Sequence, residues 1–180
     1  EVTSPAGTWH AGVIVNAAGA WADRVAGLAG LPPVGLMPLR RTIATFAVDP
    51  ALGHTGWPML GDVADTFYVK PEPGQMLASP ADETPDVPRD PRAEMLDVAT
   101  ALERVREMTT LDPRSVLRTW AGLRTFAPDR SLVLGPDPLE PSFAWCAGQG
   151  GFGIQAAPAT ARSVVSLIDE RRLPDDVRAL

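Results

Sequence analysis

The stretch from Phe143 to Pro158 constrains the fold most, because an apolar run, four glycines and the start of a helix follow one another within it. The glycines at 148, 150, 151 and 153 remove Cβ atoms, so that a flat or bulky group can lie close to the backbone. The helix that follows directs its free N–H groups and the positive end of its dipole back toward this loop. The arrangement suits a ligand that carries or develops negative charge. A plain tight turn between strand and helix is the alternative explanation of the pattern.

The glycine spacing Gly148-x-Gly150-x-x-Gly153 matches the dinucleotide-binding fingerprint. That fingerprint belongs to a βαβ unit, with a second strand and an acidic residue about 20 residues further on. Here the helix is expected to run to about Arg172, and the chain ends at Leu180. The pattern therefore does not predict a dinucleotide-phosphate loop.

Composition narrows the range of partners. The 180 residues are 45% apolar, which is enough to bury a sizeable core. The net charge of -6 argues against nucleic acid or an anionic membrane as the main partner, but local arginines can still bind an anionic small molecule. The single cysteine, Cys146, is compatible with a reducing compartment. No apolar run approaches the ~20 residues that span a bilayer, and no signal peptide is evident, so we expect a cytoplasmic location.

Both ends of the chain carry α/β elements. Residues 12–16 form a short apolar run that predicts a strand buried on both faces, and a helix is expected from about Trp21 to Ala29 with Val25 and Leu28 inward. Gly30 supplies a left-handed cap for that helix, against which Leu31 can pack. In the helix after the glycine loop, the predicted inward face comprises Ala157, Ala161, Val164, Val165 and Ile168.

The middle of the chain has a different pattern. Residues 37–48 alternate and are rich in β formers, and residues 66–69 and 75–78 predict a hairpin around a turn with two prolines and Gly74. Residues 81–90 are predicted to be a loop and residues 116–123 another strand. Asp90-Pro91 predicts a helix start, and the apolar positions that follow recur at helical spacing: Met95, Val98, Ala99, Leu102, Val105 and Met108.

The predicted fold class is therefore α+β. An antiparallel sheet with one long helix is inserted into a split α/β domain. The expected boundaries are residues 1–35 and 127–180 for the split domain and residues 36–126 for the inserted one.

Three polar side chains are candidates for binding an anionic substrate. Arg124 follows Trp120 and Leu123 at the end of a strand, and a guanidinium in apolar surroundings needs a partner such as a carboxylate. Arg41 lies on an antiparallel strand, and Tyr68, the only tyrosine, has a phenol that can donate to the same carboxylate. The alternatives are a solvated strand end for Arg124 and a half-buried strand aromatic for Tyr68.

Other chemistries have little support. His10 and His54 have no metal-ligand spacing, and His54 is expected at the surface. Neither a Cys/His cluster nor a Gly-x-Ser-x-Gly nucleophile elbow is present. Asp82, Glu83 and Asp86 are expected in a solvated loop. The sequence therefore predicts no metal ligand and no catalytic acid or base of its own, which fits a reaction whose hard step a cofactor performs.

Four motifs in order resemble the D-amino acid oxidase family of flavoproteins, which includes glycine and sarcosine oxidases. They occupy residues 13–21, 66–71, 120–124 with 127–129, and 148–155. Within that family, residues 79–84 and 147–155 look most like the D-arginine dehydrogenase branch.

The resemblance implies a role for each matching residue. Arg124 would bind the substrate carboxylate with the help of Arg41 and Tyr68, and the backbone at Gly151 would lie near the substrate amino group. Gly19 would belong to the wall of the flavin domain. The pyrimidine edge of the flavin would be contacted by Gly150, Gly151, Phe152, Gly153, Ile154 and Gln155.

The resemblance also implies FAD as cofactor and oxidation of a D-amino acid by hydride transfer to the flavin. The imino acid then hydrolyses to a 2-oxo acid and ammonia. The N-terminal half of the family pattern, which carries its dinucleotide fingerprint, is not found here. We therefore expect the C-terminal portion of a longer enzyme, inactive and without tightly bound FAD by itself, whose exposed apolar edges favour self-association. The alternatives are a glycine- or sarcosine-type oxidase and a non-catalytic binding module.

Overall fold

The computed structural model describes residues 1–178, which fall into two compact units. Residues 1–37 and 124–178 form the first unit, and residues 38–123 form the second. Helices and mostly antiparallel strands are mixed along the chain, so the predicted α+β class is confirmed. In residues 1–178, no helix is long and apolar enough to cross a bilayer.

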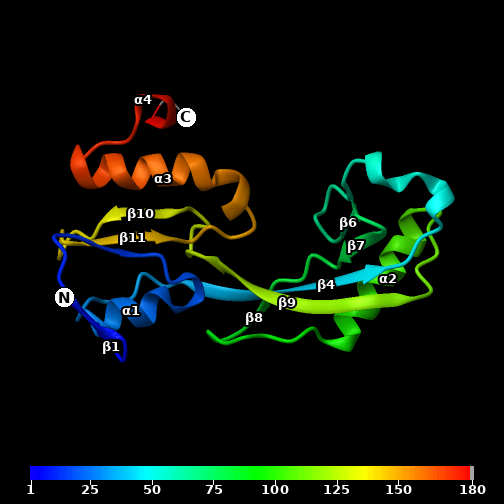
Figure 1. Ribbon diagram of the computed structural model, residues 1–180, viewed down its shortest axis with the longest axis horizontal. Coiled ribbons are helices and arrows are strands. Elements are labelled where there is room, and N and C mark those ends of the chain that lie inside the picture. The colour runs from blue at the N-terminus through cyan, green and yellow to red at the C-terminus, as the bar shows by residue number, and fades with distance from the viewer. Residues whose placement is uncertain (179–180) are drawn as a thin grey trace. The chain divides into compact units, whose positions relative to one another are not determined.

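The first unit is built on a three-stranded sheet in the order β10 (Val133–Pro136), β11 (Phe143–Ala147), β3 (Ile14–Asn16). β11 runs parallel to β3 and antiparallel to β10. Helix α3 (Gly153–Asp169) lies on one side of this sheet and α1 (Ala22–Leu28) on the other (Figure 1). The unit also holds a hairpin of β1 (Val2–Ser4) and β2 (Gly7–Trp9), the 3-10 turn η1 (Gly19–Trp21) and α4 (Asp175–Arg178).

The end of α1 has the predicted glycine cap. Gly30 has a φ of 75°, its N–H donates to the carbonyl of Gly27 at 3.1 Å, and the N–H of Leu31 donates to Ala26 at 3.0 Å. Leu31 is buried in the core of the unit. The predicted inward face of α1 is confirmed at Val25, which packs against the core, and wrong at Leu28. Ala22 and Ala26 are fully buried and Leu28 is 89% exposed, because small side chains let the helix lie close to the aromatic residues of β11.

The inward face of α3 also differs from the prediction. Val164 is buried as expected, but its buried neighbours are the small polar Thr160 and Ser163. Ala157, Ala161 and Val165 are exposed, so the apolar stripe that the sequence displays lies on an outer flank of the helix. The helix packs through small side chains, and these do not stand out in a hydrophobic periodicity.

Strand β3 is likewise not buried on both faces. It lies at the edge of its sheet, and Val15 is 47% exposed. An edge strand has a neighbouring strand on one side only, so its residues are less covered than those of the central β11, which the apolar run did not predict.

The second unit contains a larger sheet and one long helix. The strand order is β5 (Leu60–Gly61), β6 (Tyr68–Glu72), β7 (Gln75–Ser79), β4 (Met37–Phe46), β8 (Thr84–Pro85), and β9 (Val116–Phe126) also pairs with β4. The predicted hairpin is confirmed as the antiparallel pair β6–β7, whose turn has Gly74 at a φ of 74°. Short 3-10 turns η2 (Pro50–Leu52) and η3 (His54–Gly56) follow β4. Helix α2 (Met95–Met108) packs on this sheet through the core Ala44, Phe46, Phe67, Val69, Met76, Ala78, Val98, Ala101, Leu102, Val105 and Leu111.

Helix α2 starts later than predicted. Its cap position is Glu94 rather than Asp90, and Met95, Ala99 and Met108 are exposed. The start of the helix is tied to the sheet by an ion pair, because Arg40 of β4 reaches Asp97 in the first turn at 2.8 Å. A long-range contact thus sets the beginning of this helix.

Of two residues expected in solvent, Asp82 is partly buried and His54 is buried. Asp82 accepts hydrogen bonds from the Thr42 N–H at 2.7 Å and the Thr42 hydroxyl at 3.0 Å, so it anchors its loop to β4. His54 is 6% exposed, and neither of its ring nitrogens has a hydrogen-bond partner in the described chain. Both predictions failed because a loop segment folds back onto the sheet.

Asp137 is a buried carboxylate in the first unit. One oxygen accepts the indole N–H of Trp145 at 2.9 Å, and the other accepts the N–H groups of Leu139 and Glu140 at 2.8 and 3.3 Å. The hydrogen bond from Trp145, helped by the two backbone donors, holds the pKa of Asp137 below its ordinary value. The ionised carboxylate therefore stabilises the fold above that ordinary value, and the stabilisation is lost as the pH falls through the lowered pKa.

We expect Asp137→Asn to lower the free energy of unfolding at pH 7 by about 1–3 kcal/mol, because in either orientation the new NH2 group faces a donor, the Trp145 indole N–H or the N–H groups of residues 139 and 140. The difference from the wild type should shrink as the pH falls below about 4. Urea unfolding at a series of pH values measures both. Asp129→Asn, in an exposed turn where the carboxylate caps the Ser131 N–H, is the matched control. A difference that does not change with pH would contradict the assignment.

Candidate functional site

The glycine loop lies at the carboxyl edge of the small sheet. β11 and β3 are parallel neighbours, with Trp145 opposite Asn16, so the residues that follow both strands meet at the same edge. Ligands of open α/β sheets bind at this edge, outside the carboxyl ends of the strands. Gly19 follows β3 and Gly150 follows β11, and both have positive φ angles, 55° and 51°. The two predicted glycine positions are therefore brought to one edge.

Asn16 builds the turn that carries Gly19. Its side chain is buried, its amide donates to the carbonyl of Ala22 at 2.9 Å, and its carbonyl oxygen accepts the N–H of Ala18 at 3.3 Å. The side chain thus satisfies the backbone between the strand and α1, which keeps the turn in place.

Residues 124–126, the part of β9 that belongs to the first unit, lie against the glycine loop. The Gly150 N–H donates to the carbonyl of Thr125 at 2.9 Å, and the Arg124 Nη1 donates to the carbonyl of Gly151 at 3.0 Å. A Cβ at position 150 would fall 2.9 Å from Cδ1 of Phe126 and closer still to Cε1. Glycine is therefore required at 150 both by φ and by the ring.

Helix α3 begins directly after this loop with an open end. The residue before it, Phe152, makes no side-chain cap, and no acidic residue lies in the first turn. The backbone N–H groups of Gly153, Ile154 and Gln155 therefore have no capping side chain and face the loop edge with the positive end of the dipole. Such a terminus favours an anion or an electronegative ring edge.

The side chains of Gln149 and Cys146 contact each other at the start of the loop. The Gln149 amide approaches the sulfur of Cys146 at 3.7 Å. Desolvation raises the pKa of the Cys146 thiol, so the protonated form is favoured at neutral pH. This pair helps to build the turn and offers no nucleophile.

Arg41 and Tyr68 share one face of the larger sheet in the second unit. Tyr68 of β6 pairs with Ser79 of β7. Ala78 of β7 pairs with Ala44 of β4, so the next residues along these antiparallel strands, Ser79 and Ile43, lie opposite each other. By strand alternation these side chains, with Arg41 two positions from Ile43, point to the same side. Arg40 points to the other side, where α2 lies.

The guanidinium of Arg41 is held within its own unit. It is 8% exposed, its Nε donates to the carbonyl of Asp82 at 2.8 Å, and it forms an ion pair with Glu83 at 3.4 Å. The structure thus groups Arg124 with Gly151 in one unit and Arg41 with Tyr68 in the other. Sequence reasoning missed the contact between Phe126 and Gly150, for which the tight glycine spacing was the only signal.

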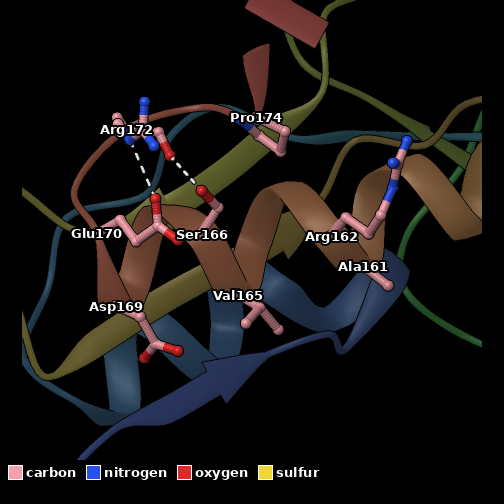
Figure 2. Close-up of a pocket in the computed structure, with 8 residues that line it drawn as sticks. All are labelled: Ala161, Arg162, Val165, Ser166, Asp169, Glu170, Arg172 and Pro174. Carbon is pink, nitrogen blue, oxygen red and sulfur yellow. Dashed lines mark hydrogen bonds and ion pairs between the residues drawn. The ribbon is translucent and has the colours of Figure 1, made fainter. Parts of the chain in front are cut away.

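Metal ligation and the hollow on α3 are two alternatives to the glycine loop within the described residues. Among residues 1–178, no group of three His, Cys, Asp or Glu side chains is arranged to hold a metal ion. A hollow of about 550 Å³ lies on the flank of α3, and Figure 2 shows the residues that line it. It is closed at one end by the turn after the helix, where the Ser166 hydroxyl donates to the carbonyl of Arg172 at 2.8 Å. None of the predicted site residues lines it.

The family model described as FAD dependent oxidoreductase, DAO, matches residues 1–167. Glycine oxidase from Geobacillus kaustophilus is 27% identical over 173 residues, which cover 95% of this chain and 44% of that protein. Hydrogen cyanide synthase subunit HcnC from Pseudomonas aeruginosa is 27% identical over 176 residues, with 97% and 41% coverage.

Solved structures agree with the sequence matches. The crystal structure of the Geobacillus kaustophilus glycine oxidase superposes with a TM-score of 0.77 at 25% identity, covering 95% of this chain and 45% of that one. L-proline dehydrogenase from P. horikoshii shares the fold, with a TM-score of 0.77 at 22% identity and 93% and 45% coverage. The chain spans less than half the length of these proteins. Because the family model matches nearly all of its residues, the chain belongs to the DAO family of FAD-dependent oxidoreductases.

Proposed function

We propose that this chain is the C-terminal portion of an oxidoreductase that oxidises D-amino acids or related amines with FAD. It would supply the substrate-binding sheet and the last part of the FAD-binding domain. The observation that carries the proposal is the placement of Arg124 at 3.0 Å from the Gly151 carbonyl, beside the uncapped start of α3. A carboxylate-binding cation, an acceptor for an amino group and a helix terminus then lie at one sheet edge.

Arg124 would orient the substrate through its carboxylate. A guanidinium binds a carboxylate by two parallel hydrogen bonds, and this fixes direction as well as affinity. The bond from Nη1 to Gly151 limits rotation of the side chain before substrate arrives. The carbonyl of Gly151 is in turn an acceptor for the substrate amino group. Arg41 and Tyr68, on one face of the sheet of the second unit, are the proposed substrate-binding residues of that unit.

The residues of the loop fit a flavin. The N–H groups of residues 153–155 lack a capping side chain, and glycine at 150 and 151 makes room for the Phe126 ring and the Arg124 guanidinium beside them. Gly19 would form the wall beside them. When bound, FAD supplies the hydride acceptor, and the terminus of α3 stabilises negative charge that develops at the edge it faces.

The resemblance to the D-arginine branch concerns the side chain of the substrate amino acid. Residues 79–84, which resemble the D-arginine branch, are used to build the fold. The Ser79 hydroxyl accepts the N–H of Ala81 at 3.1 Å, and Asp82 is bound to Thr42. The likeness to a glycine oxidase supports a second candidate, oxidation of glycine or sarcosine. A non-catalytic module is the third.

Anaerobic flavin reduction tests these candidates. The full-length, flavin-loaded protein should be bleached by its substrate, and a panel of D-arginine, other D-amino acids, glycine and sarcosine distinguishes the two catalytic classes. We expect the 180-residue chain alone to emerge from gel filtration without FAD, since it provides one edge of the binding site. Stoichiometric flavin on the isolated chain would contradict the assignment as a portion, and no bleaching by any amine would favour the non-catalytic module.

Arg124→Ala in the full-length protein should lower kcat/KM for an amino acid mainly by raising KM. Loss of one partner of a hydrogen-bonded charge pair costs about 2–5 kcal/mol, or at least about 30-fold. Steady-state kinetics measures the loss. Arg118→Ala is the control, since Arg118 lies on the same strand but is exposed and stacks on Trp120 at 5.4 Å. A loss of tenfold or less at position 124 would sink the assignment.

We also propose that the isolated chain self-associates through the outer flank of α3. Ile154 is 96% and Val165 58% exposed on this flank, and β3 lies at an open sheet edge in the same unit. Sedimentation velocity should show a mass that rises with concentration, and Val165→Lys should weaken the association. Leu28→Lys, at an exposed apolar position on α1, is the control. A monomer at every concentration would contradict the proposal.

A further inference from the structure

Three consecutive residues at the end of β9 each contact the glycine loop in a different way. Arg124 donates from its side chain to the carbonyl of Gly151 at 3.0 Å. Thr125 accepts the Gly150 N–H through its own carbonyl at 2.9 Å. Phe126 places its ring against the Cα of Gly150, so closely that a Cβ there would overlap it. The strand end and the loop are therefore joined by a charged contact, a backbone contact and an apolar contact in a row.

The ring of Phe126 sets how closely the loop can approach the strand. It is 4% exposed and therefore held by its surroundings. The guanidinium carbon of Arg130 lies 4.0 Å from the ring centroid, within the range of a cation–π contact. Arg130 reaches the ring because the chain turns after the strand, with its N–H donating to the carbonyl of Ala127 at 2.9 Å and a φ of 62°. The contact with Arg130, four residues further along the chain, therefore holds the Phe126 ring independently of the glycine loop.

We propose that Phe126 is a positioning residue for substrate binding. Its ring fixes the separation between β9 and the glycine loop, and through it the placement of the Arg124 guanidinium relative to the Gly151 carbonyl and the start of α3. This inference rests on the proposed function, in which that guanidinium binds the substrate carboxylate. Phe126 itself touches neither substrate nor cofactor in this scheme.

A purely structural role would affect stability alone, whereas a positioning role must also affect the carboxylate site. Phe126→Leu in the full-length, flavin-loaded protein should lower kcat/KM for the amino acid substrate by about 10- to 100-fold, as expected for a misplaced binding group. The inhibition constant of a plain carboxylate such as acetate should rise with KM. Phe126→Tyr keeps the ring and should stay within about threefold of the wild type, because the contact with Gly150 is retained.

Phe143→Leu is the matched control. Phe143 is 3% exposed in the same unit and packs edge-on against Trp145 at 5.4 Å, within the core of β11 and α1. Phe143→Leu removes the same ring atoms as Phe126→Leu, so its melting temperature should fall at least as much as that of Phe126→Leu. Its acetate inhibition constant should stay unchanged. Equal changes of that constant in both variants would overturn the proposal, and so would no change in Phe126→Leu.

Gly150→Ala approaches the same contact from the loop and should by itself raise the acetate inhibition constant, which keeps the proposal testable if Phe126→Leu does not fold. The added Cβ meets the ring, so the losses of Gly150→Ala and Phe126→Leu should not multiply in the double variant. Fully multiplicative losses would contradict the contact as the cause.

Hydrogen exchange separates this inference from the proposed function. The Gly150 amide is bonded to Thr125, so its exchange in the full-length protein should accelerate at least about tenfold in Phe126→Leu and not in Phe143→Leu. If no amine reduces the flavin of the wild type, the proposed function fails, and the exchange result still decides whether Phe126 fixes the loop. Unchanged exchange in Phe126→Leu overturns the positioning role.

Discussion

The hydrogen bond from the Gly150 amide to the Thr125 carbonyl is the contact on which the candidate site depends. It joins two segments that lie far apart in the sequence, and it forms only because position 150 has no side chain. Once it is made, the carbonyl of Gly151 comes within 3.0 Å of Arg124, and α3 starts with its N–H groups directed at the same edge. The bond gives the Gly150 amide an acceptor, so the bond and the loop conformation reinforce each other.

Local physics made parts of the fold predictable. The turn between β6 and β7 and the end of α1 follow from glycine at a positive φ and from proline, whose effects extend over only a few residues. The faces of α1 and α3 were not predictable in this way. Ala22, Thr160 and Ser163 are buried because close packing needs small side chains, while the larger Leu28 and Val165 remain exposed. Hydrophobic periodicity weights residues by size and apolarity, so it missed these small residues on both faces.

The candidate site was partly predictable for a similar reason. The glycine spacing and the helix after it indicated an uncapped terminus, and an arginine in apolar surroundings indicated a need for a partner. The partner itself, the carbonyl of Gly151, could not be derived from spacing, because it comes from a contact between distant segments. The same holds for Asp82 and Thr42 and for Arg40 and Asp97, where polar residues that look solvated in the sequence fix a loop and a helix start.

The division of the chain has a consequence for the order in which its parts form. Residues 38–123 are continuous, and their contacts can be completed as soon as that stretch has been synthesised. The other unit needs β3, near the start, to pair with β11, which follows more than a hundred residues later. Closing so long a loop is slow, and it is made easier when the intervening residues are already compact. The sheet that carries the glycine loop is therefore expected to assemble last, on the ends of a unit that is already folded.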